Sequence, residues 1–480
     1  MSNSELLLNI LISRRFIIRL RLISLNKDNI LKQLEVIVGK DFVSNREEDL
    51  YIYSQDPGAS LPRHVDFIVL PEKIEEIQKI VKLANQEKIP IVPMGGGLTL
   101  SGLIIPVKGG IVLDMKRMNN IIEINEFSKY ALIEAGVTTG QLLSYLNESY
   151  PNLEPPVPDA PPSATVAGNV LIHGSGYLSQ KYGDHGAMIN GLEVVLPSGD
   201  VCRLGSSAIS KYWFARGPIP DLIGLFISSF GTMGIVTKVS VQLFDKPKFR
   251  EVVLGLFKDP KSIPNVLLEV TRTGLAEDVL LGMQDKPDWM KGYVFITVFV
   301  TGESQEEIDA HIKTFKRVFR KAKARYMKAP ERFRRAYLEK PIFAATAADF
   351  RKGGGFEYVG ANMPLKKIPE AYLKGSEISK KYGIIPTLGS RLIGGTHNIM
   401  MFFSYSFNRA DPKDMQNARN ALHETNQLAL ELGGIPWKSE LDGQRLILEK
   451  MDPNYKKLFN MIRNTLDPNK IMNPGNWEVK

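Results

Sequence analysis

The sequence predicts an α+β protein of two domains, on three observations. The chain has 480 residues, more than one hydrophobic core usually serves. Between His64 and Val137, short apolar segments alternate with segments of helical periodicity, as in a mixed α and β domain. After Pro247 the strands become longer, and residues 294–300 place a β-branched residue at every second position. That spacing is typical of a half-buried antiparallel strand.

The elements of the first half follow from hydrophobic periodicity and from residues typical of helix starts and turns. Pro71 suits the first turn of a helix in which Ile77, Ile80 and Ala84 share one face. Thr138 is a suitable N-cap for the next helix. We expect, in order, a helix, a short strand and a loop within 29–60, strand 64–70, helix 71–89, strands 90–94, 110–115 and 131–137, helix 139–149, and strands 191–196, 201–204 and 231–244.

The second half predicts an antiparallel sheet with helices. Strands are expected at 292–302 and 398–407, and helices at 365–382 and 412–433. The predicted units are an extension at 1–28, a first domain at 29–247, a second domain at 248–450 and a tail at 451–480, in which the segment DPNKIMNPGNW is loop-like.

The extension 1–28 is apolar but is interrupted by four arginines, so it offers no uncharged run of about 18 residues that could span a membrane. Positive charge does not precede an apolar core, as it would in a signal peptide. We expect a poorly ordered extension or a misassigned start of translation. A helix lying on a membrane surface is the alternative.

Composition excludes several classes of site. Cys202 is the single cysteine, so the chain can form no internal disulfide and no thiolate metal centre by itself. The net charge is +9, and much of the excess lies in a basic run at 313–340. This run predicts a solvated amphipathic helix and loop, or a docking face for an acidic partner or an anionic membrane. No nucleic-acid-binding module accompanies it, so we expect no nucleic-acid partner.

A glycine cluster, VPMGGGLTLSG at 92–102, lies between two expected strands. Successive glycines allow backbone amides to converge on an anion, and Thr99 and Ser101 add hydroxyl donors. A pyrophosphate fits such a nest, and a plain turn is the alternative. No Gly-Lys-Ser/Thr follows, so this is not a P-loop, and it does not open a helix as a Rossmann glycine motif does.

Several segments in fixed order resemble a known family. They are IVPMGGGLTLSG, GIVLDMKRMNNIIEI, ALIEAGVTTGQLLSYL, PPSATVAGNVLIHGSGYLSQKYGDH, GLEVVLPSGDV, LFISSFGTMGIVTKVSVQL and LDPNKIMNPGNW. The set resembles the PCMH-type FAD-binding domain of the vanillyl-alcohol oxidase and p-cresol methylhydroxylase superfamily. The last segment is similar to the glycolate oxidase and D-lactate dehydrogenase branch. The resemblance implies a two-subdomain FAD-binding domain and an antiparallel α+β cap domain that holds substrate.

The resemblance also implies which residues contact FAD. The glycine cluster would wrap the pyrophosphate, the segment after the Pro-rich stretch would line the other side, a later strand would flank the dinucleotide, and the tail would return to the flavin. The implied residues are Pro93, Gly95, Gly96, Gly97, Leu98, Thr99, Gly102, Pro158, Thr165, Gly168, Asn169, Gly176, Tyr177, Gly231, Gly234, Ile235, Val236 and Asn473. Because the glycine cluster contains no histidine, we expect FAD to be bound without a covalent link.

The segment GSRLIGGTH, 389–397, resembles one with which the glycolate oxidase branch binds a divalent metal. Ser390 and Ile393 replace a histidine and an aspartate there, and only His397 remains. In the later segment Glu440 keeps an acidic position, but Leu441 replaces a histidine. Two ligands make a poor metal site, so we expect no catalytic metal.

Alcohol oxidation by a flavin requires a base for the hydroxyl proton and an anchor for the substrate. In KYGDHG, Tyr182, Asp184 and His185 are candidates for the active site, and a hydrogen-bonded cluster that stabilises the loop is the alternative. His397 is a second candidate base, or a structural histidine at a strand entrance.

Two cations are candidates for the substrate anchor. Trp437 and Lys438 stand where the vanillyl-alcohol branch holds a phenolate with tyrosine and arginine. Lys438 and Arg391 would hold a carboxylate or phenolate, and a surface position is the alternative for each.

The sequence therefore predicts an FAD-linked oxidoreductase that acts on CH–OH groups. The first substrate class is a 2-hydroxy acid such as glycolate or D-lactate, and the alternative is a phenolic or other small alcohol. A non-catalytic subunit of a flavoprotein complex is the alternative of another class. We expect a homo-oligomer in the cytoplasm, with peripheral contact at the inner face of the membrane as a further alternative. Oxygen, a quinone, a cytochrome or a partner subunit remain open as electron acceptor.

Overall fold

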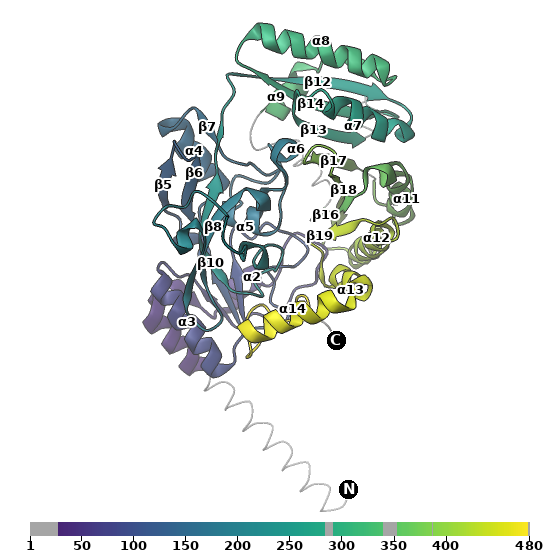
Figure 1. Ribbon diagram of the computed structural model, residues 1–480. Helices are drawn as coiled ribbons and strands as arrows, with labels where there is room; N and C mark the ends of the chain where they lie inside the picture. Colours follow the sequence, from purple (N-terminus) through teal and green to yellow (C-terminus); the bar gives the residue numbers. More distant parts are fainter. Residues whose placement is uncertain (1–26, 284–290, 339–352, 386, 479–480) are drawn as a thin grey trace, which may run out of the picture.

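The computed structural model describes residues 27–283, 291–338, 353–385 and 387–478. The chain forms two bodies that lie side by side, one built from the first half and one from the middle of the chain (Figure 1). Residues 1–26 of the expected extension and Lys340 of the basic run lie outside the described residues. Within these described ranges, no helix is both long and apolar enough to cross a membrane.

A small sheet near the start of the chain carries the glycine cluster. Its strands, in spatial order, are β1 (Val43–Ser44), β2 (Phe67–Val69), β4 (Ile111–Asp114) and β3 (Ile91–Met94). Helix α3 (Ile74–Glu87) packs on it because Ile77, Ile80 and Ala84 form a buried stripe. Helix 27–38 joins the same core, and α2 (Glu47–Tyr53) follows it. Strand β3 ends where the glycines begin, so the sheet fixes the start of that loop.

A second sheet is antiparallel and shares this core. Its strands, in spatial order, are β5 (Ile121–Asn125), β6 (Tyr130–Glu134), β10 (Ile235–Gln242), β8 (Ile189–Val195) and β9 (Val201–Gly205). Thr138 caps α4 (Thr139–Ser149) by accepting a hydrogen bond from the Gln141 amide, as the sequence predicts. Helix α5 (Val166–Leu171) buries Val166, Ala167 and Val170 in the core. The small strands β7 (Leu153–Glu154) and β11 (Phe244–Asp245) pair with each other in antiparallel orientation.

The cap is one antiparallel sheet of eight strands among the described residues. In spatial order they are β15 (Arg325–Met327), β12 (Phe249–Phe257), β14 (Val294–Gly302), β13 (Ala276–Met283), β17 (Leu388–Ile393), β18 (Asn398–Asn408), β16 (Gly354–Met363) and β19 (Ile435–Trp437). The cap helices are α7 (Ile263–Thr271), α8 (Gln305–Lys321), α9 (Glu331–Leu338), α11 (Ile368–Lys381) and α12 (Pro412–Glu431). Figure 1 places α7, α8, α11 and α12 around the outside of the cap.

The prediction that strand 292–302 is half-buried is wrong. Val294, Ile296 and Val298 pack in the cap core, but Phe295 and Phe299 on the other face are buried as well. That second face packs against Val157, Tyr177 and neighbours of the first domain. Both faces are apolar because the strand lies between the cap helices and the first domain.

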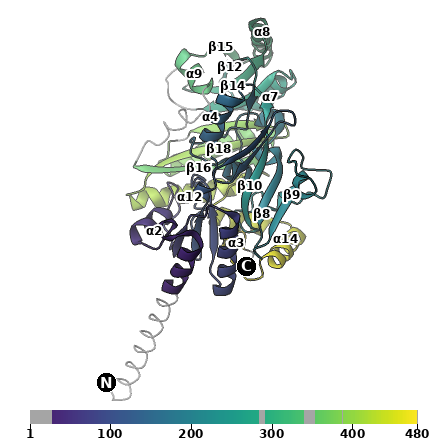
Figure 2. The ribbon, with the colours of Figure 1, turned by 90° about the vertical axis from the view of Figure 1, so that its left-hand side faces the viewer.

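The tail returns to the first domain. After α13 (Leu441–Lys450), helix α14 (Pro453–Leu466) packs Phe459 and Ile462 against the first core. The amide of Ile91 donates to the carbonyl of Ile471, at 2.7 Å. Both views place α14 near α3 and far from α8 (Figures 1 and 2). The α+β fold with an antiparallel cap is thus confirmed; the residue boundaries of the domains stay a prediction.

Candidate active site

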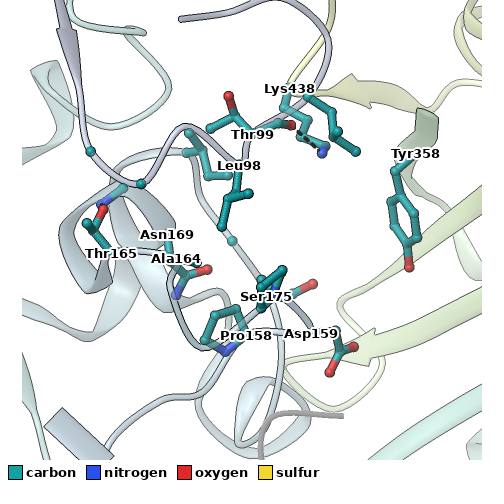
Figure 3. Close-up of a pocket in the computed structure, with 18 of the residues that line it drawn as sticks. Leu98, Thr99, Pro158, Asp159, Ala164, Thr165, Asn169, Ser175, Tyr358 and Lys438 are labelled. Atoms are coloured by element: carbon teal, nitrogen blue, oxygen red, sulfur yellow. Dashed lines mark hydrogen bonds between the residues drawn. The ribbon is translucent and has the colours of Figure 1, made fainter. Parts of the chain in front are cut away.

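A large cavity lies where the two domains meet. It encloses about 1270 Å³ of empty space, part of it open to solvent. One wall consists of the glycine loop 95–100 and the segment 158–175, and the other consists of side chains from β16, β17, β18 and β19. Figure 3 shows Leu98, Thr99, Pro158 and Asp159 on the first wall, Tyr358 across the cavity from Leu98, and Lys438 beside Thr99. The cap wall is thus positioned mainly by strands, and the opposite wall by the loop after β3 and by the segment that includes helix α5.

The glycine loop fits its place only without side chains. A Cβ on Gly95 would lie 2.3 Å from Thr165 Oγ1, and a Cβ on Gly96 would lie 2.7 Å from the Ser163 carbonyl. Gly97 has a φ of 70°, which favours glycine. The amides of residues 96–101 donate no hydrogen bond within the described part of the chain. Free amides grouped in one turn form a nest for an anion.

A second cavity of about 780 Å³ continues the first. The two share Gly95, Thr99, Ile104, Gly168 and Ile172 as lining residues. Its remaining wall is largely apolar, with residues such as Met115, Leu171, Phe226, Phe230 and Val236. The two cavities, which meet beside the glycine loop, are together called the channel.

Most residues predicted for FAD line this channel. In the first cavity these are Gly95, Gly96, Gly97, Leu98, Thr99, Pro158, Thr165, Gly168 and Asn169. Pro93, Gly231, Gly234 and Val236 line the second cavity. The structure therefore brings together loops that are far apart in sequence.

The other predicted FAD residues lie behind the wall. Gly176 packs closely against Val157 and Pro158. A Cβ on Gly176 would lie only 2.0 Å from the Val157 carbonyl oxygen, so the position requires glycine. Asn473 ties the tail to two loops, and its Nδ2 donates to the Phe230 carbonyl at 2.6 Å. Gly102, Tyr177 and Ile235 also line neither cavity. These residues support the channel from behind.

One end of the first cavity carries a charged cluster. Arg391 is fully buried; its Nη1 donates to Asp159 Oδ2 at 2.6 Å, and its Nη2 lies 3.1 Å from Asp278 Oδ2. Asp159 and Arg391 line the cavity, whereas Asp278 lies behind them on β13. Burial raises the pKa of Asp159, and it raises the pKa of Asp278 to about 7. A carboxyl group of raised pKa in a cavity is a candidate proton acceptor.

A second cation lies at the other end. Lys438 Nζ donates to the Thr99 carbonyl at 2.6 Å and lies over the rings of Trp437 and Tyr358. Burial lowers the pKa of Lys438 to about 8, although the carboxylates of Glu357 and Asp56 act in the opposite direction. Burial in turn raises the pKa of Glu357 to about 7.

The cap wall between these ends is aromatic. Tyr358 stacks on Phe402 with ring centroids 4.1 Å apart, and Phe356 and Met400 line the same wall. Trp437 donates from Nε1 to the Ile172 carbonyl at 2.8 Å, which joins the cap to the first domain. The wall offers a dry face to a planar or apolar molecule.

Four predicted catalytic side chains line neither cavity. His185 is buried: its Nδ1 lies 2.7 Å from Asn169 Nδ2, and its Nε2 lies 3.1 Å from the Tyr177 carbonyl. Because the side-chain amide of Asn169 donates this hydrogen bond, Nδ1 of His185 accepts it and the imidazole ring is neutral. Burial lowers the pKa of His185 to about 3. His185 thus orients Asn169, which does line the channel.

The others lie further out. Burial raises the pKa of Asp184 to about 6, but its nearest ionic neighbour is His173, at 3.9 Å. Tyr182 is exposed and stacks on Phe244. His397 is exposed in the turn between β17 and β18. Of the predicted catalytic groups, the structure brings only Arg391 and Lys438 to the cavity.

Sequence reasoning missed Asp159 and the aromatic wall. Asp159 follows Pro158, which was selected, but an aspartate among prolines gives no signal of its own. Phe356 and Tyr358 lie on β16, a strand that was not predicted. In the described part of the chain, no three His, Cys, Asp or Glu residues are grouped as metal ligands would be.

Comparison with known families decides the cofactor. An FAD binding domain matches residues 65–205, and the C-terminal domain of FAD linked oxidases matches residues 267–477. The chain belongs to the FAD-linked oxidases. The predictions of FAD as cofactor and of oxidoreductase activity are therefore confirmed.

Relatives of this FAD-linked oxidase carry different activities. It is 26% identical to the glycolate oxidase subunit GlcD of Bacillus subtilis over 94% of this chain and 97% of that protein. It is 25% identical to the 4-cresol dehydrogenase flavoprotein subunit of Pseudomonas putida, over 93% and 94% of the two chains. It is 27% identical to a D-lactate dehydrogenase of Archaeoglobus fulgidus, over 89% and 95%.

Solved structures show the same fold. A p-cresol methylhydroxylase with substrate bound has a TM-score of 0.82 at 23% identity, covering 94% of this chain and 97% of that one. A 4-ethylphenol oxidase from Gulosibacter chungangensis has a TM-score of 0.84 at 21% identity, with the same coverage. The predicted PCMH-type fold is thus confirmed.

The channel of this FAD-linked oxidase fits the cofactor. The free amides beside Gly96 and Gly97 suit a pyrophosphate, and Thr99 Oγ1 is a buried hydroxyl without a hydrogen bond among the described residues. The apolar second cavity suits an adenine, and the space beside Pro158 and Asn169 suits a flavin ring. No histidine, cysteine or tyrosine stands in the glycine loop, so a non-covalent FAD remains the prediction.

Proposed function

We propose that this enzyme oxidises the hydroxyl-bearing carbon of a small alcohol with an aromatic or other apolar body, including phenolic alcohols. The observation that carries this proposal is the aromatic wall of Phe356, Tyr358 and Phe402, which faces the segment that carries Asp159. Such a wall binds a planar apolar body, while a single carboxylate serves the hydroxyl group.

The charges of the cavity favour a substrate without a carboxylate. Arg391 faces two carboxylates, Asp159 and Asp278. Lys438 likewise interacts with two, Glu357 and Asp56. If all these groups are ionised, each cluster carries one excess negative charge, which would repel an anionic substrate. A 2-hydroxy acid is the second candidate, favoured by Lys438 at the cavity wall and by relatives named as glycolate and D-lactate enzymes.

Each residue then has a defined task. Asp159 accepts the hydroxyl proton, and Arg391 holds that carboxylate in place. The stacked pair of Tyr358 and Phe402 orients the substrate body and excludes water. Bound FAD would supply the acceptor for a hydride from the carbon. Lys438 fixes the end of the glycine loop through the Thr99 carbonyl.

Flavin absorbance under anaerobic conditions tests this proposal with a matched pair. Mandelate is benzyl alcohol with a carboxylate in place of one hydrogen, so the two compounds differ in the group under question. We expect benzyl alcohol and 4-hydroxybenzyl alcohol to bleach the flavin, and mandelate, D-lactate and glycolate to do so at least ~10-fold more slowly. Faster bleaching by the acids would replace the proposal with the second candidate.

The choice of electron acceptor, the homo-oligomer and the cytoplasmic location stay predictions. The basic run also remains a proposal for an acidic or membrane partner. Of its charges, Lys321 pairs with Glu269 and Arg334 pairs with Glu251. Both pairs reduce the net charge that this face offers.

A further inference from the structure

Asp278 shares the guanidinium of Arg391 with Asp159 but has no access to the cavity. Asp278 is wholly buried in β13, and its Oδ1 accepts a hydrogen bond from the Val279 amide. Its Oδ2 forms an ion pair with Arg391 Nη2 at 3.1 Å but accepts no hydrogen bond among the described residues. A buried carboxylate with so few partners is costly, so its presence needs a physical reason.

Among the described residues, Arg391 is the cation that pairs with Asp278. Arg250, which like Arg391 acts on Tyr177, is held by Glu277 at 2.5 Å and by Glu154 at 2.7 Å. The other titratable neighbours of the cluster are Glu277, whose charge also acts to raise the pKa of Asp278, the Tyr177 hydroxyl and the neutral ring of His185. The Tyr177 hydroxyl donates to the Tyr337 carbonyl.

Charge counting gives the cluster a preferred proton content. One guanidinium and two ionised carboxylates leave one negative charge in a buried place, and uptake of one proton makes the cluster neutral. The two carboxylates titrate as a coupled pair, because both contact the same cation. Proton uptake by either one therefore relieves the excess charge of both.

We propose that Asp278 is a positioning residue that makes Asp159 a competent proton acceptor by competing with it for Arg391. This inference rests on the proposed function. In the reaction the O–H bond of the substrate breaks and its proton passes to the Asp159 carboxylate. The C–H bond breaks with both electrons passing as hydride to FAD, and a C=O bond forms. The cluster, singly negative before the step, is neutral after it.

The first test is the pH profile of flavin reduction in Asp278→Asn, which keeps the size of the side chain. In this variant Arg391 serves Asp159 alone, so the pKa of Asp159 falls. We expect the acidic limb of the profile to move at least about one unit to lower pH, and the plateau rate to fall ~3–30-fold because the base is weaker. Glu277→Gln is the matched control, because it removes the neighbouring buried carboxylate, which pairs with Arg250. The acidic limb of its pH profile should move by less than half as much as that of Asp278→Asn.

The second test needs no turnover and no Asp278 variant. In resting wild-type protein, the pair should contribute an infrared band of a protonated carboxyl that persists up to about neutral pH and then disappears, beside the bands of Glu357 and Asp184. In Asp159→Asn that transition should move to lower pH, because Arg391 then serves Asp278 alone. This comparison remains valid if Asp278→Asn does not fold.

The two tests distinguish a failure of the proposed function from a failure of the role proposed for Asp278. If no alcohol reduces the wild-type flavin, the proposed function fails, while the infrared comparison still decides the role of the pair. If alcohols do reduce the flavin but Asp278→Asn keeps the wild-type limb, or the infrared transition is the same in Asp159→Asn, then Asp278 has only a structural role.

Discussion

The two walls of the channel are built on opposite principles. The wall of the FAD-binding domain presents backbone and small residues, and Gly95 and Gly96 have no space for a Cβ. The cap wall presents large side chains, among them Phe402, Tyr358 and Arg391. A cofactor phosphate is recognised by amides that every residue possesses, so the sequence must remove side chains there. A substrate is recognised by particular side chains, so the cap wall sets specificity.

The largest effect is expected when a side chain is added to the glycine loop of the FAD-binding domain. In Gly95→Val the new side chain meets Thr165 at 2.3 Å, so the loop must move away from the pyrophosphate. We expect FAD affinity to fall at least ~100-fold, and the protein to be purified without flavin absorbance. Gly224→Ala is the control, since its Cβ would have no heavy atom nearer than 3.8 Å. Full flavin content in Gly95→Val would show that the glycine loop is a plain turn.

The next largest effect is expected at Asp159, the proposed proton acceptor where the two walls meet. Asp159→Asn keeps the shape but cannot accept the hydroxyl proton, so flavin reduction by an alcohol should slow ~10²–10⁴-fold. Stopped-flow absorbance measures this rate, and the flavin content should not change. Asp245→Asn, which changes an exposed aspartate paired with Lys129, is the control. A rate within threefold of wild type would remove Asp159 from the mechanism.

A smaller effect tests the specificity of the cap wall. Phe402→Ala removes the ring that stacks on Tyr358, so KM for an aromatic alcohol should rise ~10-fold with a lesser change in kcat. FAD affinity should stay as it is, because the backbone wall is intact. The control is Phe127→Ala, at a fully exposed position. Equal losses for aromatic and small aliphatic alcohols would contradict a stacking role.

The smallest effect concerns the support behind the backbone wall. Burial lowers the pKa of His185 from 6.5 to about 3, so the folded state binds fewer protons than the unfolded state between these values. Stability from this group is present above about pH 6.5 and is lost as pH falls toward 3. In His185→Gln the melting temperature should therefore depend less on pH between 7 and 4, by a few degrees. His397→Gln, at an exposed histidine, should follow the wild-type curve.

The contrast between the walls also explains what the sequence could predict. Glycines and short strands in fixed order are local signals, so the loop at 95–99 and the strands around it were found. The neutral role of His185 depends on burial by Tyr177 and Asn169, which local sequence does not reveal. The same holds for β14: its second buried face is covered by the other domain, a contact far away in sequence.

The cap residues were harder to predict because their roles come from pairing across strands. Arg391 was selected as a free cation for substrate, but it is shared by Asp159 and Asp278, which lie more than 100 residues before it. Lys438 was selected for the same task, and its hydrogen bond goes to the glycine loop. Residue type predicted that these cations matter; only the fold assigns their partners.

The most direct test of the account is the absorbance spectrum of the purified protein, recorded anaerobically before and after 4-hydroxybenzyl alcohol and then after denaturation. The account predicts a flavin spectrum, its bleaching by the alcohol, and release of FAD from the denatured chain. A colourless protein that does not take up added FAD would contradict the proposed channel. A coloured protein that no alcohol or hydroxy acid bleaches would contradict the assignment of the cap wall.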